Sequence, residues 1–399
     1  MSEEIKPIAL SKGAKKAFSY ILHNQSVTRA SICTALGIGA VTAGKYTQEL
    51  LDCGMIKEDG FMDSSGGRKP IAYSVNNTGR YILCINISTI YCEVAVSDFN
   101  LHLQSIRHFR ILPDDKPDAV VAKIWAVYPS IKEELCIEDS SFIGAGVILY
   151  GAIKNQHGVM YRPIVQYMNE GWIDYPILDR LSSFLPMPVY AEKGITATAS
   201  LEYNYGIGRR CRSLLYILCA MNIRSAFVLD GKVQGSSPFY EDAFGHMVIN
   251  YDGLACRCGQ YGCINCYASI PAVLDTYRKG VKLGGHTIIA ADPDNVTIEE
   301  VCKAACGNDE CASNAIVKAA RMLGVALANY ANVTSPEIVL IAGLLPELSD
   351  LYYETAMNTA RERLRKTDND NAVFYKVGSF PSPLTTSGAS LVLDCFFGA

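Results

Sequence analysis

The sequence predicts an α/β protein in which a small winged helix-turn-helix domain precedes a body of two α/β lobes. Within the first 80 residues, apolar side chains recur at helical spacing and then give way to short strand-like segments. From residue 81 onward, strand-like and helical segments alternate over about 320 residues, which is typical of layered α/β domains. A chain of 399 residues is long enough for these parts and a large core.

The N-terminal segment is divided by its apolar spacing and its glycines. A Gly-Ile-Gly run at 37–39 makes a tight turn between two helical patterns, and Gly54 ends the last of them. Three helices followed by a hairpin form a winged helix-turn-helix. We expect helices at about 12–23, 28–36 and 40–53, with Thr28 as the N-cap of the second, and short strands at 55–56 and 72–75 with a loop between them.

The third of these helices has features of a helix that enters the major groove of DNA. Val41 and Leu50 are expected on its buried side. Thr42, Lys45 and Gln48 are expected on its outer face. Thr42 and Gln48 can hydrogen-bond to bases or phosphates, and Lys45 can neutralise a phosphate.

The loop between the two strands carries Arg68 and Lys69 in a Gly-Gly-Arg-Lys-Pro run. An arginine that follows two flexible glycines can enter the narrow minor groove of DNA. Residues 1–80 carry a net charge of +3 in a chain of net charge −4, and a basic segment on an acidic body fits a DNA-reading module. The alternative is a three-helix protein-docking domain with a solvated basic loop.

A metal-ligand motif lies in the second half of the chain. His246 is followed after nine residues by Cys-Arg-Cys-Gly-Gln-Tyr-Gly-Cys, which supplies Cys256, Cys258 and Cys263. One imidazole and three thiolates are a ligand set that tetrahedral zinc prefers, and the glycines allow the chain to fold tightly around the ion. Four protein ligands leave no open position, so we expect structural Zn²⁺. The alternative is a set of buried thiols with a core histidine.

The composition indicates a cytoplasmic protein. The N-terminus lacks a basic start followed by an apolar stretch, and the longest apolar runs are too short to span a membrane. Fifteen cysteines are scattered and odd in number, which favours reduced thiols over a disulfide framework. Cys302, Cys306 and Cys311 lack a tight metal-binding spacing, so we expect them to pack helices.

The segments of the body follow from period-2 and period-3.6 apolar patterns. Strands are expected at 81–87, 91–96, 142–149, 188–191, 214–218, 226–229 and 338–342, and helices at 117–131, 196–203, 312–333 and 350–365.

The Gly-His plus Cys-x-Cys-Gly-x-x-Gly-Cys motif resembles the zinc signature of the ROK family, which contains bacterial sugar kinases and sugar-responsive repressors. The N-terminal segment is similar to the DNA-binding head of the ROK repressors, a head that the kinases lack. This second match covers Thr28-Arg29-Ala30, Gly37-Ile38, Thr42, the run from Glu49 to Gly54 and the Gly-Gly-Arg-x-Pro loop, and it adds Arg29 to the DNA-contacting candidates.

The resemblance implies that the body is an actin-like pair of sugar-kinase lobes with a cleft between them, assembled as a homodimer. The expected domains are a winged helix-turn-helix at 1–78, a first lobe at 79–205 joined by a C-terminal helix at about 385–399, and a second lobe with the zinc loop at 206–384.

The residues that perform phosphotransfer in the family are replaced here. The first phosphate loop, normally Asp-x-Gly-Gly-Thr, falls on Asn-Ile-Ser-Thr-Ile at 86–90, and the second falls on 220–224 without a glycine. The run that carries the catalytic aspartate reads Glu-Lys-Gly-Ile-Thr, which places Gly194 at the base and Lys193 at a sugar-binding asparagine. Two sugar-binding glutamates become Ala243 and Asn265, and only His246 persists.

These substitutions favour a DNA-binding transcriptional regulator, a repressor with a catalytically inactive body, over two alternatives. One alternative is an active ATP-dependent sugar kinase, and the other is a ligand-independent scaffold that binds DNA or a protein partner. A sugar or sugar-phosphate effector could bind the cleft, and Lys193 and Arg224 favour an anionic one unless Lys193 pairs with Glu192. The expected effector residues are Lys193, Gly194, Arg224, His246 and Asn265.

Overall fold

The computed structural model describes residues 10–24, 26–62, 69–149, 153–154, 159–160, 170–234, 243–367, 369 and 371–397. The chain divides into two compact units. The first contains Met1–Leu201 and Ser382–Ala399, and the second contains Glu202–Pro381. The N-terminal head is counted with the first unit, and its sequence-based boundary at residue 78 stays a prediction.

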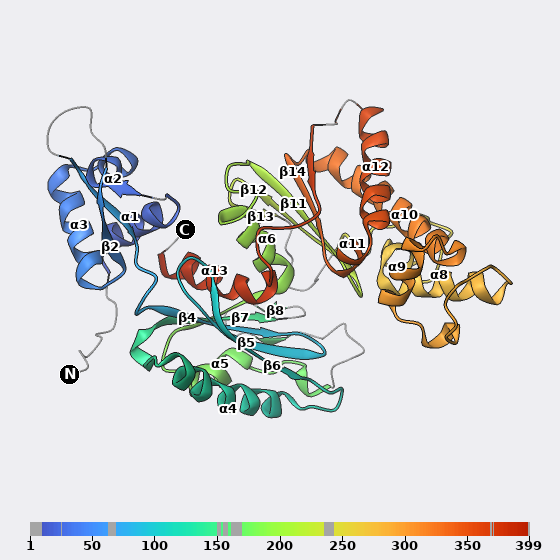
Figure 1. Cartoon of the computed structure of the whole chain (residues 1–399), viewed down its shortest axis with the longest axis horizontal. Coiled ribbons are helices and arrows are strands. Elements are labelled where there is room, and N and C mark those ends of the chain that lie inside the picture. Colours follow the sequence, from blue (N-terminus) through green and yellow to red (C-terminus); the bar gives the residue numbers. More distant parts are fainter. Residues whose placement is uncertain are drawn as a thin grey trace. The chain divides into compact units, whose positions relative to one another are not determined.

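The head has the predicted helices and hairpin (Figure 1). Its antiparallel sheet has the order β1-β3-β2, and its core includes Phe18, Ile32, Leu50 and Tyr73, each fully buried. The elements are α1 (Lys12–Leu22), β1 (Val27–Thr28), α2 (Arg29–Leu36), α3 (Ala40–Asp52), β2 (Ile56–Phe61) and β3 (Ile71–Val75).

The buried face of α3 differs from the expected one. Val41 is 77% exposed, whereas Ala43, Thr47 and Leu50 form the buried stripe. These three positions follow the i, i+4, i+7 spacing of one helix face, and Val41 falls outside it. The prediction that Val41 is buried is therefore wrong.

The start of α2 is fixed by a capping box, as the sequence indicated for Thr28. The backbone N–H of Ser31 donates to Thr28 Oγ1 at 3.2 Å, and the backbone N–H of Thr28 donates to Ser31 Oγ at 3.1 Å. The helix ends at Gly37, whose φ of 63° suits glycine. Gly39 precedes α3 without a side-chain cap.

The rest of the first unit is a five-stranded sheet with helices on both faces (Figure 1). The strand order is β10-β7-β4-β5-β6, with parallel pairing of β7 to β10 and to β4 and antiparallel pairing beyond β4. The elements are β4 (Tyr81–Ile87), β5 (Tyr91–Ser97), β6 (Leu103–Arg110), α4 (Pro117–Leu135), η1 (Asp139–Ser141), β7 (Phe142–Leu149), β8 (Ile153–Lys154), β9 (Val159–Met160), η2 (Glu170–Trp172), α5 (Ile177–Ser182), β10 (Val189–Lys193), α6 (Gly194–Asn204, which ends in the second unit) and α13 (Pro383–Phe397).

The two faces of this sheet are packed differently. On one face, Leu83 and Ile85 of β4 join Val120, Ile124 and the rest of a buried cluster under α4 and α5. On the other face, α13 packs directly on β4 and β7. This alternation follows from the period of two along a strand that is buried on both sides.

The second unit contains another five-stranded sheet, of order β13-β12-β11-β14-β15, with its helices (Figure 1). Its core combines β11 and β14 with α8, α9, α10 and α12. The elements are β11 (Ser213–Cys219), β12 (Ile223–Leu229), β13 (Lys232–Gln234), α7 (Asn265–Ala268), α8 (Ile270–Lys282), η3 (Pro293–Asn295), α9 (Ile298–Cys306), α10 (Glu310–Thr334), β14 (Ile338–Ala342), α11 (Leu344–Leu348), α12 (Asp350–Arg365) and β15 (Val373–Tyr375).

Helix α10 has the length and apolarity of a membrane span, and among the described residues it is the one helix with both. Within its apolar window 61% of the residues are buried, and α10 packs along α12, which is the setting of a core helix. Cys302 and Cys311 are buried in this core as expected, whereas Cys306 is exposed.

Candidate functional site

The four predicted metal ligands come together in the second unit. The ligand atoms of His246, Cys256, Cys258 and Cys263 all lie within 4.8 Å of one another. His246 Nδ1 is 3.6 Å from Cys256 Sγ, and Cys258 Sγ is 3.7 Å from Cys263 Sγ. Tetrahedral zinc with Zn–S of about 2.3 Å and Zn–N of about 2.0 Å places two sulfurs about 3.8 Å apart and sulfur and nitrogen about 3.5 Å apart. These two distances match those of a tetrahedral zinc site, so the donor set fits zinc.

The loop that carries these ligands is folded tightly by local backbone contacts. The Cys256 N–H donates to Gln260 O at 2.7 Å, and the Gly259 N–H donates back to Cys256 O at 3.0 Å. Gly262 has a φ of 75°, and a Cβ there would lie 1.6 Å from Asn250 O. Glycine is required at this position because any side chain would push the two loop segments apart.

The electrostatics of the ligands favour a bound cation. Burial lowers the pKa of His246 and the charge of Arg257 lowers it further, so the neutral imidazole that can bind a metal is favoured. Burial, together with the neighbouring Cys256 and Cys258, raises the pKa of Cys263. Three adjacent thiolates repel one another unless a positive ion lies between them.

Sequence reasoning missed a fourth sulfur, that of Cys266, beside this cluster. Cys266 lies in α7, and its Sγ is 3.6 Å from the carbonyl oxygen of Ala255, the residue before the ligand Cys256. Its position three residues after Cys263 was the available signal, because a short helix returns the chain toward its start.

The predicted DNA-contacting residues differ in their surroundings. On α3, Lys45 and Gln48 are exposed and Thr42 is half-buried. Gln48 Nε2 donates to Asp52 Oδ1 at 2.8 Å on the same helix face. The exposed Val41 lies one residue before Thr42, so α3 begins with an apolar group suited to a thymine methyl.

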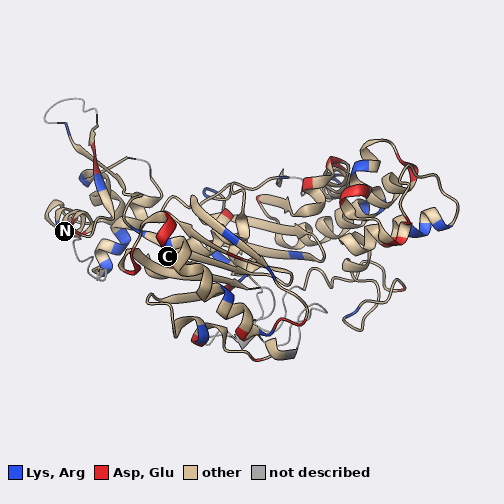
Figure 2. Ribbon diagram, turned by 60° about the horizontal axis from the view of Figure 1, so that its bottom comes forward, with Lys and Arg blue, Asp and Glu red and all other residues tan. Residues whose placement is uncertain are grey.

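Arg29 is held within the head. Its Nε donates to Thr47 Oγ1 at 3.0 Å, and its guanidinium lies 5.5 Å from the centre of the Tyr73 ring. These contacts join α2, α3 and β3, so part of the Arg29 side chain is already used for packing. Lys69 is exposed at the end of the predicted wing, and Arg68 lies outside the described residues. Figure 2 shows the Lys and Arg positions on the ribbon.

The expected effector residues of the first unit lie at the junction of β10 and α6. Lys193 ends the strand and is 6% exposed, and Gly194 begins the helix. The Lys193 N–H donates to Glu192 Oε1 at 2.8 Å. A Cβ at Gly194 would lie 2.9 Å from Leu384 Cδ2, so a side chain of α13 fills the space into which a residue larger than glycine would project.

The expected effector residues of the second unit have structural contacts. Asn265 Oδ1 accepts a hydrogen bond from the Ile223 N–H at 2.6 Å, which ties the zinc loop to the first residue of β12. Arg224 is 6% exposed on the same strand, and both Arg224 and Lys193 have interaction partners. His246 belongs to the metal cluster.

Asn86 marks a polar patch that sequence reasoning did not predict. Its side chain is 2% exposed, and its Nδ2 has no hydrogen-bond partner among the described residues. On the neighbouring strand, Glu93 is paired with it in register and accepts a hydrogen bond from Thr385 of α13. A buried amide therefore stands at the start of the segment where the resemblance placed a phosphate loop, with a half-buried carboxylate beside it on the neighbouring strand.

A sequence model described as the ROK family matches residues 82–392, which is more than half of the chain. The chain belongs to the ROK family. The matched region begins after the head, and the predicted family is confirmed.

Several ROK proteins match the chain beyond that region. A putative xylose repressor of Caldicellulosiruptor sp. strain Rt8B.4 is 26% identical over 84% of this chain and 83% of its own length. The DNA-binding transcriptional repressor Mlc of Escherichia coli K12 is 22% identical over 93% of this chain and 90% of its own length. These names agree with the predicted regulator and give the kinase alternative less support.

Two solved ROK structures cover different shares of this chain. A ROK family transcriptional regulator described as a homologue of E. coli Mlc superposes with a TM-score of 0.82 and 22% identity over 97% of this chain and 96% of its own. A ROK family glucokinase from Streptomyces griseus, solved with glucose and AMPPNP, gives a TM-score of 0.65 and 18% identity, and covers 78% of this chain and 98% of its own. The predicted fold class, α/β with actin-like ROK lobes, is confirmed.

Proposed function

We propose that this ROK protein is a DNA-binding transcriptional repressor whose sugar-kinase-like body holds structural zinc and has no phosphotransfer activity. One observation carries the proposal. The superposition with a regulator structure covers 97% of this chain. The superposition with a kinase structure covers 98% of the kinase but leaves about a fifth of this chain unmatched. The family match starts at residue 82, so the additional segment is the N-terminal head.

The head supplies the DNA-binding surface as a winged helix-turn-helix. Lys45 and Gln48 project into solvent from α3, as a helix that lies in the major groove requires. Thr42 and the exposed Val41 add a hydroxyl and an apolar contact at the N-terminal end of that helix. The hydrogen bond from Arg29 of α2 to Thr47 of α3 holds α3 in place, which lowers the conformational entropy lost when this helix binds DNA.

The absence of phosphotransfer follows from chemistry at Gly194. Glycine has no group that accepts a proton from a sugar hydroxyl, and Leu384 occupies the adjacent space. At the first phosphate loop, Asn86 replaces the aspartate, and Ser88 and Thr89 replace the two glycines that would leave backbone N–H groups open to a phosphate. These features support an inactive kinase body.

The role of zinc in this body is to stabilise the fold. His246, Cys256, Cys258 and Cys263 would hold Zn²⁺ as a closed four-ligand site, which contributes folding free energy and leaves no position for a reacting water. The Asn265–Ile223 hydrogen bond connects the braced loop to β12.

The partners of this repressor are an operator in double-stranded DNA, a sugar or sugar-phosphate effector, and a second copy of the chain in the cytoplasm. Relatives named xylose repressor and N-acetylglucosamine repressor support a carbohydrate signal. Lys193 and Arg224 would have to exchange their present partners to bind an anionic effector. A homodimer supplies two heads for two half-sites about 34–36 Å apart.

The proposal is tested by genome-fragment selection with the zinc-loaded full-length protein, followed by footprinting and assays of ATP turnover with a panel of sugars. Two protected half-sites without ATP turnover support the proposal. Sustained sugar phosphorylation establishes the kinase alternative instead. A protein that binds DNA but gains no thermal stability from any sugar or sugar phosphate is the ligand-independent scaffold.

A further inference from the structure

A basic groove runs between α10 and α12 in the second unit. The two helices approach closely where a Cβ at Gly324 would lie 2.6 Å from Ala356 O and 2.6 Å from Thr359 Cβ. Beyond this crossing the helix surfaces form a hollow of about 520 Å³, within the range of small-molecule sites. The lining residues are Arg321, Val325, Ala328, Asn329, Asn332, Thr359, Glu362, Arg363, Lys366 and Thr367.

The charged groups of the groove are mostly positive. Arg321, Arg363 and Lys366 are exposed, and Glu362 is the single carboxylate in the lining. Within the part of the chain that the structure describes, these three cations have no carboxylate within ion-pair distance, although the whole chain carries a net charge of −4. Three positive charges along one groove with a single carboxylate repel one another, and a bound anion would lower that repulsion.

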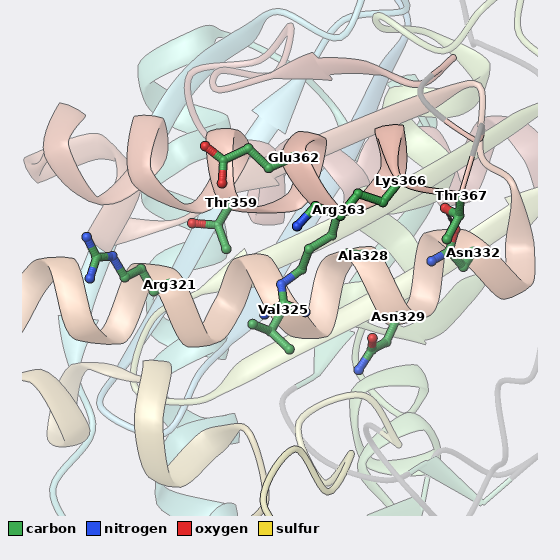
Figure 3. A pocket seen from close by; sticks show the side chains of 10 residues that line it. All are labelled: Arg321, Val325, Ala328, Asn329, Asn332, Thr359, Glu362, Arg363, Lys366 and Thr367. Carbon is green, nitrogen blue, oxygen red and sulfur yellow. Dashed lines mark hydrogen bonds between the residues drawn. The ribbon is translucent and has the colours of Figure 1, made fainter.

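The groove has a floor and one closed end. Ala328 is buried and Val325 and Thr359 are half-buried, so the floor is small and partly apolar. At one end, Thr367 Oγ1 donates to Asn332 Oδ1 at 2.8 Å. Figure 3 shows Arg321 at the opposite end, with Arg363 and Lys366 between them. A bounded hollow suits a small ligand better than a polymer that must continue past both ends.

We propose that this groove binds a phosphate group, carried by a small hydroxylated metabolite such as a sugar phosphate. Arg321, Arg363 and Lys366 supply the guanidinium and ammonium donors that phosphate oxygens accept. Asn329 and Asn332 supply amide groups for hydroxyls. The site is independent of the proposed repressor function, because it lies wholly in the second unit and uses none of the expected effector residues.

The test is titration calorimetry on the zinc-loaded full-length protein with glucose 6-phosphate, inorganic phosphate and glucose. We expect glucose 6-phosphate to bind most tightly, inorganic phosphate more weakly, and glucose not to bind here. Arg363→Ala and Lys366→Ala should each weaken glucose 6-phosphate binding at least tenfold. Glu362→Gln should strengthen it several-fold, because the variant removes the one like-charged group. Lys303→Ala, a change of an exposed lysine on α9 of the same unit, should leave the affinity unchanged.

Three results would overturn the proposal. The first is no heat of binding with either phosphate compound, and the second is binding that Arg363→Ala and Lys366→Ala leave unchanged, which would place the ligand elsewhere. The third is loss of DNA affinity in the groove variants with sugar-phosphate binding retained, which would assign the basic groove to a nucleic-acid backbone. Circular dichroism of each variant establishes that the fold is kept, and normal operator binding by these variants leaves the repressor proposal unaffected.

Discussion

Gly146 of β7 and Gly388 of α13 meet backbone to backbone. A Cβ at Gly146 would lie 1.9 Å from the Gly388 carbonyl oxygen and 2.8 Å from its Cα. The two residues are far apart in sequence, and their contact lets the C-terminal helix lie directly on the sheet of the first unit. Any side chain at either position would have to separate the helix from the sheet.

Replacement of Gly146 by alanine should therefore destabilise the protein. We expect a loss of about 3 kcal/mol or more in the free energy of unfolding, because the methyl group meets rigid backbone rather than a movable side chain. Urea denaturation followed by circular dichroism measures it. Gly44→Ala is the matched control: nothing lies within 4 Å of its Cβ position in α3, so it should gain about 0.5–1 kcal/mol. Equal effects of the two variants would contradict the observed packing.

The metal cluster predicts one zinc ion per chain. Mass spectrometry of the native protein should detect it, and Cys258→Ser should weaken zinc binding by more than about 100-fold, because a direct ligand matters more than a neighbour that orients it. Chelation should unfold the loop around the site and lower the melting temperature. Cys306→Ser, which changes an exposed cysteine outside the cluster, should retain full zinc content. Native protein without metal after expression in zinc-rich medium would refute a zinc site.

Lys45 should contact the DNA backbone. Lys45→Ala is expected to weaken binding to operator and to non-operator DNA by a similar factor. It should also reduce the slope of log affinity against log salt concentration by about 1. Fluorescence anisotropy at several salt concentrations measures both quantities. Lys303→Ala, which removes an exposed charge from α9, should change neither. An unaltered salt slope in Lys45→Ala would place the DNA on another surface.

Gln48 should affect sequence preference rather than general affinity. Its amide can face a base edge only after leaving Asp52, with which it now shares a hydrogen bond of 2.8 Å. Gln48→Ala should cost about 1–3 kcal/mol on the operator and much less on unrelated DNA. Competition binding against a library of operators with single base changes measures the effect. A uniform loss across all sequences would show that Gln48 contacts the backbone.

The capping box makes α2 sensitive to Thr28. Thr28→Ala removes the acceptor for the Ser31 N–H and should lower the free energy of unfolding by about 1 kcal/mol. Thermal unfolding measures the change. Thr34→Ala lies in the same helix at an exposed position and should be neutral or slightly stabilising, because alanine has the higher helix propensity. A larger loss in Thr34→Ala than in Thr28→Ala would contradict the role of the cap.

Local patterns in the sequence identified some of the helices and strands that carry the candidate sites, such as α3, but not α7. The bounds of β7 and α12 follow from apolar spacing, and the start of α2 follows from Thr28, because each depends on neighbouring residues only. The metal cluster was equally predictable. Its ligands are spaced so closely that a short loop with two glycines must bring them together.

Contacts between distant segments could not be read in this way. Leu384 fills the space beside Gly194, Asn265 is tied to Ile223, and Arg29 is tied to Thr47. Val41 is exposed, although its side chain is apolar. Each of these contacts depends on which faces of the helices and sheets pack against one another. Packing energy summed over many residues determines those faces. The sequence by itself therefore determined the set of metal ligands, because their spacing is local. Only the tertiary structure determined the surroundings of each ligand and the basic groove between α10 and α12, because these depend on how distant segments pack.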